Sequence, residues 1–472
     1  MRIIAIWLPT ITVPAAAPPV HNGLITGLPQ SYISPTVSTT TPPNCTVMNT
    51  HVPISRDRKK RLVFYDVKFN QDQDCFAVAH ETGFSVYNSN PIDPRVSRTF
   101  SGTSSSGTGI GLISMLHRTN YLALVGGGKN PRYPNNKVII WDDLKRKASL
   151  NLGFMGPVVN VLLSRIRIVV VLTNQVVVYE FSAPPKKFAS YETYDNEHGV
   201  ADLAVHSATM SSSISPAPSS SSSVKSGNGN SREASKYQIL AFPGRTIGQI
   251  QLVDISPQGS EKNFVSIIKA HKARIRCICL NRTGTMIASA SETGTIIRIH
   301  STTSTALLYE FRRGLDKAII TSMSFSSNDS KLAVLSDKNT LHVFNVGSIG
   351  DAAVADQLNG EMSQHQAQRN RQHILNKLQL PISIPNYFQS TWSFCSVNMN
   401  RYHADIEEGS LGNDIGTIGW SGNNNIIVVW REKKIWEIYS IVEKFSSPAK
   451  GIEKDADFEL IRSSWKTLDD MS

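Results

Sequence analysis

Two adjacent arginines, Arg312 and Arg313, are the residues of this 472-residue chain whose type and spacing best suit the binding of a ligand. Consecutive residues of an extended segment point to opposite sides, so the two side chains should enter two separate grooves. Each guanidinium can bind two phosphate oxygens at once. Gly314 follows and lets the chain turn tightly beyond them. The pair predicts two anion sites, and the alternative is a solvated surface pair.

Matching polar and basic residues occur in the two sequence repeats that flank this pair. The fifth repeat supplies His271, Ser291, Thr295 and Arg298, and the sixth supplies Ser336, Lys338, Thr340 and His342. Arg298 and His342 occupy equivalent places in their repeats. Serine and threonine also suit strands and turns, which is the plainer interpretation. The doubling, with one set on each neighbouring repeat, favours two anion pockets.

The element that must position these residues is a recurring pair of strands. Each copy has an apolar alternating segment, a short turn and a second segment that ends in a large residue. Three of the six intervals between copies lie near the roughly 40–45 residues of a WD-type propeller blade. The seven copies end at Tyr87, Trp141, Tyr179, Val253, His300, Phe344 and Tyr439.

Seven such units predict an all-β fold, a seven-bladed WD40-type β-propeller over residues 56–468. A hairpin is marginal alone, whereas four-stranded sheets arranged radially bury each other's faces. Two or three separate β-sandwiches are the alternative, and the regular spacing argues against them. The longer intervals contain inserts, a serine-rich loop at 207–235 and a polar, basic loop at 347–390. Residues 1–55 are rich in Pro, Thr and Ser and predict a disordered tail, with a misassigned start as the alternative.

Other motifs do not support an enzyme. GGGK at 126–129 lacks the Ser or Thr and the helix of a phosphate-binding loop. No nucleophile elbow occurs, and the twelve histidines show no metal-ligand spacing. We therefore expect no catalytic residues, no metal and no cofactor.

Composition limits the compartment and the class of partner. The formal charge of +11 predicts an acidic partner such as an anionic membrane, a nucleic acid or an acidic protein. The sequence shows no cluster of aromatic residues that would stack on bases, so nucleic acid is not expected. Five cysteines without a disulfide pattern suit a reducing compartment. No apolar run approaches the 18 or so residues of a membrane span, and the apolar start of the chain breaks at Pro9.

The residues around the arginine pair resemble the PROPPIN family of polyphosphoinositide-binding propellers. FRRG at 311–314 is the hallmark of that family, and the resemblance extends over most of 60–470. It includes GTGIG at 107–111, RTNYLALVGGGKNPR at 118–132, KVIIWDDL at 137–144, LNRTGTMIASAS at 280–291 and MSFSSNDSKLAVLSDKNTLHVF at 323–344. The resemblance implies two sites for phosphatidylinositol 3-phosphate and phosphatidylinositol 3,5-bisphosphate.

The resemblance also assigns residues to each lipid site. The first site is assigned His271, Ser291, Thr295, Arg298 and Arg312, and the second is assigned Arg313, Ser336, Thr340 and His342. Lys338 is our own addition to the second site.

The insert after Phe344 resembles the family's membrane-contacting loop of the sixth blade. Its segment 361–381 predicts a helix with a short apolar face and flanking basic residues, which suits the headgroup zone. Packing of that face on the propeller is the alternative. The apolar residues are Ile374, Leu375, Leu378 and Leu380.

These features together predict a monomeric, non-enzymatic, peripheral membrane protein. The resemblance implies a cytoplasmic protein that visits vacuolar, endosomal and preautophagosomal membranes. It implies a role in autophagy-related traffic such as micronucleophagy, with autophagy proteins docking on the second blade. The alternative is a WD-type protein-interaction scaffold with a basic rim.

Overall fold

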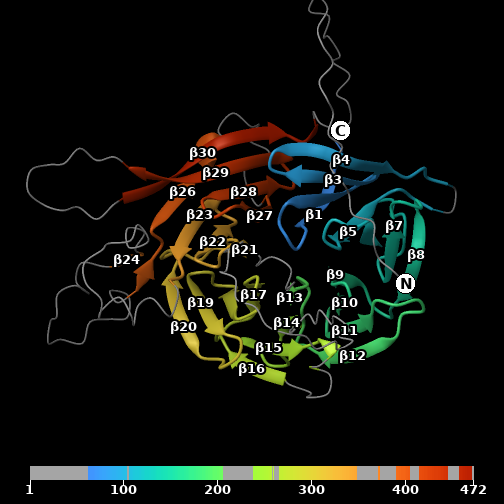
Figure 1. Cartoon of the computed structure of the whole chain (residues 1–472), viewed down its shortest axis with the longest axis horizontal. Helices are drawn as coiled ribbons and strands as arrows, with labels where there is room; N and C mark the ends of the chain where they lie inside the picture. Colours follow the sequence, from blue (N-terminus) through green and yellow to red (C-terminus); the bar gives the residue numbers. More distant parts are fainter. Residues whose placement is uncertain are drawn as a thin grey trace, which may run out of the picture. The chain divides into compact units, whose positions relative to one another are not determined.

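A computed structural model describes residues 62–103, 106–205, 238–257, 259, 265–347, 370–372, 390–403, 414–444 and 457–469. Their strands form seven sheets arranged around a common centre, a seven-bladed β-propeller (Figure 1). The predicted fold class is therefore confirmed. The predicted tail at 1–55, the serine-rich loop at 207–235 and the four apolar residues at 374–380 lie outside the described residues.

The first four blades each contain four strands that follow one another in the chain and pair antiparallel. In chain order the strands are β1 Phe64–Phe69, β2 Cys75–His80, β3 Gly83–Ser89 and β4 Ile92–Thr99 in blade 1; β5 Ile110–Met115, β6 Tyr121–Gly126, β7 Lys137–Asp142 and β8 Lys147–Gly153 in blade 2; β9 Val158–Leu163, β10 Arg167–Leu172, β11 Gln175–Glu180 and β12 Lys187–Glu192 in blade 3; and β13 Asp202–Val205, β14 Gln238–Pro243, β15 Gln249–Asp254 and β16 Val265–Lys269 in blade 4.

Blades 5 to 7 follow the same plan, and blade 5 gains two short outer strands. A 3-10 helix, η2 Met399–Tyr402, follows the last strand of blade 6. The strands are β17 Ile275–Leu280, β18 Met286–Ser291, β19 Ile296–Ser301 and β20 Leu307–Arg312 in blade 5, extended by β25 Thr391–Trp392 and β24 Arg371–Gln372; β21 Ile320–Phe325, β22 Lys331–Ser336, β23 Thr340–Asn345 and β26 Cys395–Asn398 in blade 6; and β27 Gly416–Ser421, β28 Asn425–Trp430, β29 Ile435–Lys444 and β30 Asp457–Thr467 in blade 7.

The strand pairs recognised in the sequence are the second and third strands of each blade. In three blades the second strand is buried along its whole length, namely Cys75–His80, Arg167–Leu172 and Lys331–Ser336. Neighbouring blades cover both faces of these strands, which explains their nearly continuous apolar sequence. Each of the seven interfaces between neighbouring blades contains its own cluster of buried apolar residues.

The ring closes by packing rather than by exchange of a strand. The structure shows that β30 pairs with β29, while β1 pairs with β2 in blade 1. Phe64 and Val67 of blade 1 and Trp436 and Ile438 of blade 7 share one buried cluster. Burial of apolar surface therefore joins the first blade to the last.

The insert of blade 6 returns to the propeller as strands. β25 runs parallel to β20, pairing Trp392 with Arg312, and β24 pairs with β25. The helix predicted over 361–381 is therefore wrong at Arg371 and Gln372, which are extended. β25 pairs with the outer edge of β20, and pairing of Arg371 and Gln372 with β25 outweighs local helix propensity.

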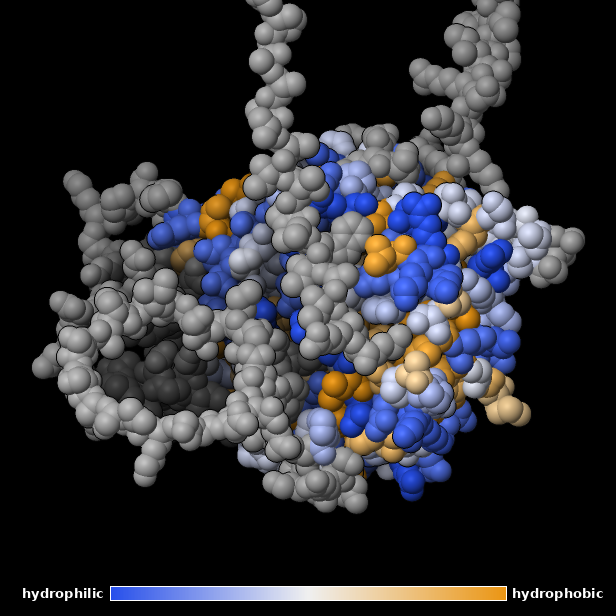
Figure 2. All heavy atoms as spheres, turned by 45° about the vertical axis from the view of Figure 1, so that its right-hand side comes forward, coloured by the Kyte–Doolittle hydropathy of each residue, from blue (hydrophilic) through white to orange (hydrophobic). Residues whose placement is uncertain are grey.

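The surface of the propeller mixes apolar and polar residues. In Figure 2, which is turned so that the right-hand side of Figure 1 comes forward, hydrophobic and hydrophilic residues are intermingled on the face in view. No helix within the described part of the chain is long and apolar enough to cross a bilayer. The four cysteines that the structure describes are free thiols.

Candidate functional site

The arginine pair closes the outer strand of blade 5. Arg312 is the last residue of β20, and Arg313 follows it. Phe311 stacks on Phe344 of β23 with ring centroids 4.7 Å apart, so this side of β20 faces blade 6. Alternation along the strand places Arg312 on the opposite face, with Glu310, and turns Arg313 towards blade 6. The two side chains therefore diverge, as the sequence predicts.

The residues of the first set gather between blades 4 and 5 around Arg298. Arg298 donates from Nη1 to the Ala270 carbonyl at 2.6 Å and from Nε to Glu310 Oε2 at 2.8 Å. His271 Nε2 lies 3.0 Å from Ser289 Oγ, and Ser289 is the cross-strand neighbour of Arg298. Burial, together with the charge of Arg298, lowers the pKa of His271 to about 4. At neutral pH, His271 is therefore an uncharged group beside a cation.

Ser291, Thr295 and Arg312 border this cluster. Ser291 Oγ bonds Thr293 Oγ1 at 2.9 Å at the turn between β18 and β19. Arg312 is the cross-strand partner of Ile296, the residue after Thr295, and donates from Nε to Ser390 Oγ at 3.0 Å. The Thr295 carbonyl accepts the backbone N–H of Arg313 at 2.9 Å. Thr295 thus lies next to both arginines rather than to the first alone.

The second set lies between blades 5 and 6. Ser336 Oγ and Thr340 Oγ1 are 2.8 Å apart, and His342 Nδ1 lies 3.1 Å from Ser393 Oγ. Burial and the nearby charge of Arg313 lower the pKa of His342 to about 4. His342 is the third residue of β23, as Arg298 is of β19, which confirms that the two are equivalent.

Lys338 is exposed at the tip of the turn between β22 and β23. This turn also carries Ser336 and Thr340, the hydroxyl residues of the second set. Lys338 therefore lies in the same turn as these hydroxyl residues, with its side chain exposed.

Arg313 is the most unusual cation of the site because only 6% of its surface is exposed. It donates from Nε to the Gly294 carbonyl at 2.8 Å and from Nη2 to the Asp316 carbonyl at 2.5 Å. Burial lowers its pKa, and the charges of Asp337 and Asp316 oppose that shift. Among the described residues, no carboxylate oxygen lies within 4.0 Å of its nitrogens. A buried cation without a close counter-charge favours an anionic ligand.

Four residues that contact the site were absent from the sequence prediction. Ser289 and Glu310 flank Arg298 on its two neighbouring strands. Alternation could have found both, since Glu310 precedes Arg312 by two residues and Ser289 precedes Ser291 by two. Ser390 and Ser393 come from the end of the blade 6 insert, and nothing in the sequence places that segment against β20 or β23.

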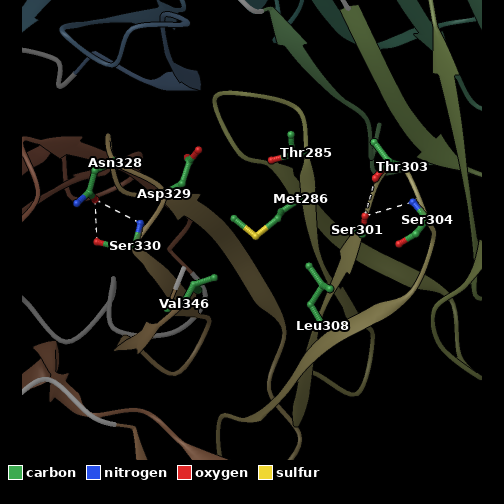
Figure 3. A pocket seen from close by; sticks show the side chains of 11 residues that line it. Thr285, Met286, Ser301, Thr303, Ser304, Leu308, Asn328, Asp329, Ser330 and Val346 are labelled. Atoms are coloured by element: carbon green, nitrogen blue, oxygen red, sulfur yellow. Dashed lines mark hydrogen bonds between the residues drawn. The ribbon is translucent and has the colours of Figure 1, made fainter. Parts of the chain in front are cut away.

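A separate cavity of about 390 Å³ lies between blades 5 and 6, at the ends of their strands that lie away from the arginine pair (Figure 3). Ser301, Asn328 and Asp329 line it, with Met286 contributing apolar surface. None of its lining residues, all of them in the described part of the chain, is Lys, Arg or His. The cavity therefore offers a phosphate no counter-charge and does not belong to the anion sites.

Comparison with known proteins shows which family the chain is similar to. The sequence model of the PROPPIN family matches residues 229–359. SVP1-like protein 2 of Debaryomyces hansenii is 59% identical over 436 residues, which cover 90% of this chain and 100% of that protein. SVP1-like protein 2 of Saccharomyces cerevisiae is 36% identical, covering 87% of this chain and 98% of that protein.

Solved structures show the same fold. Kluyveromyces lactis Hsv2 with its complete loop 6CD superposes with a TM-score of 0.61 at 25% identity, covering 86% of this chain and 100% of that one. The complex of KlAtg21 with the coiled coil of AgAtg16 gives 0.56 at 19% identity, covering 86% of this chain and 99% of that one. Identity over nearly the full length of its relatives, together with the matching family model, shows that the chain belongs to the PROPPIN family.

Proposed function

We propose that this chain is a non-enzymatic, monomeric, peripheral membrane protein that binds phosphatidylinositol 3-phosphate and phosphatidylinositol 3,5-bisphosphate. The observation that carries the proposal is the buried guanidinium of Arg313, held by two backbone carbonyls at Gly294 and Asp316. These bonds use Nε and Nη2 and leave the Nη1 hydrogens for a phosphate. Hydrogen bonds between charged partners are about twice as strong as neutral ones.

Each face of β20 serves one headgroup in this proposal. The first headgroup is bound by Arg312 and Arg298 beside His271, with Ser291 and Thr295 at the border. Because Glu310 already neutralises part of the Arg298 charge, a phosphate there must compete with a carboxylate. Two headgroup sites on one rigid blade raise the affinity for a membrane through effective concentration.

The second headgroup is bound by Arg313 beside His342, Ser336 and Thr340, with Lys338 at the mouth. The blade 6 insert then reaches the same membrane through Ile374, Leu375, Leu378 and Leu380, which remains a prediction from the sequence.

The cellular role is a further part of the proposal. It places the cytoplasmic protein on vacuolar, endosomal and preautophagosomal membranes in autophagy-related traffic such as micronucleophagy. The complex of KlAtg21 with a coiled coil of AgAtg16 supports autophagy proteins as partners, because that chain has the same fold. We propose no nucleic acid partner. A WD-type scaffold that ignores lipid is the competing function.

Flotation with vesicles of defined composition tests the proposal. We expect binding to phosphatidylcholine vesicles that contain phosphatidylinositol 3-phosphate or the 3,5-bisphosphate. We expect little binding when the same mole fraction of unphosphorylated phosphatidylinositol replaces them. Equal binding to all three would indicate general attraction of the chain's positive charge to anionic lipid and would contradict the proposal.

Headgroup binding is also expected to depend on pH through the two histidines. His271 and His342 have pKa values of about 4 in the free protein, and a bound phosphate raises them. Binding therefore takes up protons, so the histidines add affinity as pH falls from 7 towards 5, by about threefold or more.

Protonation of the phosphate itself, near pH 6, acts in the opposite direction. The measurement is therefore the ratio of wild-type affinity to that of a His271→Gln, His342→Gln variant, taken by calorimetry at several pH values. The ratio should rise as pH falls. A constant ratio between pH 7 and pH 5 would show that neither histidine faces the ligand.

A further inference from the structure

The loop that joins β20 to β21 carries two exposed apolar residues directly after the arginine pair. Leu315 exposes 64% of its surface and Ile319 exposes 42%, with the exposed Lys317 between them. Single exposed apolar residues are ordinary on protein surfaces, so exposure alone indicates little. What matters for this loop is its position beside the arginine pair and the bonds that hold it.

The loop is fixed at both ends. Near its start, Arg313 Nη2 donates to the Asp316 carbonyl at 2.5 Å. Near its end, the Ile319 N–H donates to Asp337 Oδ1 of the neighbouring turn at 3.0 Å. Leu315 lies between Arg313 and Asp316, the two residues that the first bond joins, and still exposes most of its surface. A loop that is already ordered loses little conformational entropy when its tip is buried by a partner.

Leu315 is also close to where a headgroup phosphate would be held. It follows Arg313 by two residues, so its Cα lies within about 7 Å of that of Arg313. A lipid whose phosphate contacts Arg313 has its glycerol and acyl chains only a headgroup's length away. The bilayer interface is then within reach of Leu315, and we expect the exposed Lys317 to be attracted to anionic lipid.

We propose that the loop over residues 314–319 is a second membrane-contacting element, in which Leu315 inserts into the bilayer interface beside the headgroup sites. The inference rests on the proposed lipid function. The partner of this loop is a lipid bilayer. The loop is separate from the insert of blade 6. The loop presents an apolar side chain and a cation next to a phosphate site, and this combination suits the interface of an anionic bilayer.

A Leu315→Ser variant tests the inference on two ligands. On vesicles containing phosphatidylinositol 3-phosphate, we expect binding about tenfold weaker than wild type, because an apolar side chain no longer leaves water. On soluble inositol 1,3-bisphosphate, we expect affinity within twofold of wild type. The matched control is Leu144→Ser, in the turn between β7 and β8, since Leu144 is 72% exposed. This control should bind both ligands as wild type does.

A Leu315→Trp variant gives an independent readout. Its tryptophan emission, taken as the difference from wild type, should shift to shorter wavelength when these vesicles are added. Lipids brominated on the acyl chain should quench it. No shift and no quenching, with Leu315→Ser equal to wild type on vesicles, would overturn the inference while leaving headgroup binding intact.

Other outcomes separate the two proposals. If Leu315→Ser loses soluble headgroup as well as vesicles, Leu315 supports the headgroup site and the membrane role is wrong. If the wild-type protein binds neither vesicles nor headgroup, the proposed function fails and this inference fails with it.

Discussion

Replacing both Arg312 and Arg313 by threonine is expected to weaken binding to vesicles that contain phosphatidylinositol 3-phosphate by about 100-fold or more. Each guanidinium contributes hydrogen bonds to a charged phosphate, worth about 1.5–3 kcal/mol per bond, and the variant removes at least one from each face of β20. Flotation and calorimetry with soluble headgroup should both report the loss. A scaffold that ignores lipid would still bind its protein partner.

The control for this experiment must remove the same charge elsewhere. Arg95 lies on β4 of blade 1, and Arg118 lies in the turn between β5 and β6 of blade 2. Their side chains are 46% and 48% exposed, and each lies near an aspartate. An Arg95→Thr, Arg118→Thr variant should bind as wild type does. Arg313 is buried and bonds two carbonyls, so its replacement could unfold the propeller. A cooperative thermal unfolding transition must therefore show that the double variant at 312 and 313 is folded. A folded variant that still coats vesicles would contradict the account.

Replacing Glu437 by alanine is expected to destabilise the propeller by about 3–5 kcal/mol. Glu437 is fully buried in blade 7, where Trp430 Nε1 donates to it at 2.8 Å and Tyr439 at 3.0 Å. Its other oxygen lies 3.0 Å from His403 Nε2 and accepts from Arg462 Nη1 at 3.0 Å. Removing the carboxylate takes a partner from four polar groups, of which Arg462 keeps the Tyr402 carbonyl at 3.3 Å. Thermal and denaturant unfolding measure the loss.

The same carboxylate makes the free energy of unfolding depend on pH in the acid range. Burial would raise the pKa of Glu437, but hydrogen bonds from His403, Trp430 and Arg462, with the charge of His403, bring it below the ordinary value of 4.5. Its contribution is therefore complete above about pH 4.5 and is lost as pH falls through the lower pKa of the folded state.

A Glu437→Gln variant should lose less stability than wild type over that acid range. The matched control is Glu459→Ala on β30, whose side chain is 40% exposed and pairs with Lys444 at 3.5 Å. An exposed pair contributes at most about 1 kcal/mol. Equal losses for Glu437→Ala and Glu459→Ala would show that the buried network does not stabilise blade 7.

The blades could be predicted from sequence because propeller strands carry a strong local signal. The second and third strands of each blade are apolar, short and separated by tight turns, so Cys75–His80 and Lys331–Ser336 are recognisable without any knowledge of their neighbours. Outer strands such as Lys187–Glu192 are half exposed and carry no such pattern. Ring closure by β30 could not be deduced either, because strand pairing at the ends of the chain depends on the whole ring.

The site was predictable to the extent that it follows strand alternation. The divergence of Arg312 and Arg313 follows from an extended backbone, and the equivalence of Arg298 and His342 follows from the repeat. The contacts from Ser390 and Ser393 depend on how the blade 6 insert returns to the propeller. Local sequence within that insert favoured a helix, but Arg371 and Gln372 pair with β25, which itself extends the edge of β20.

A crystal structure of the protein soaked with inositol 1,3-bisphosphate would test the central claim most directly. The account predicts two headgroups, one with a phosphate on Arg312 and Arg298 and one with a phosphate on Arg313 near His342. A headgroup bound only elsewhere, such as in the cavity lined by Ser301 and Asn328, would contradict it.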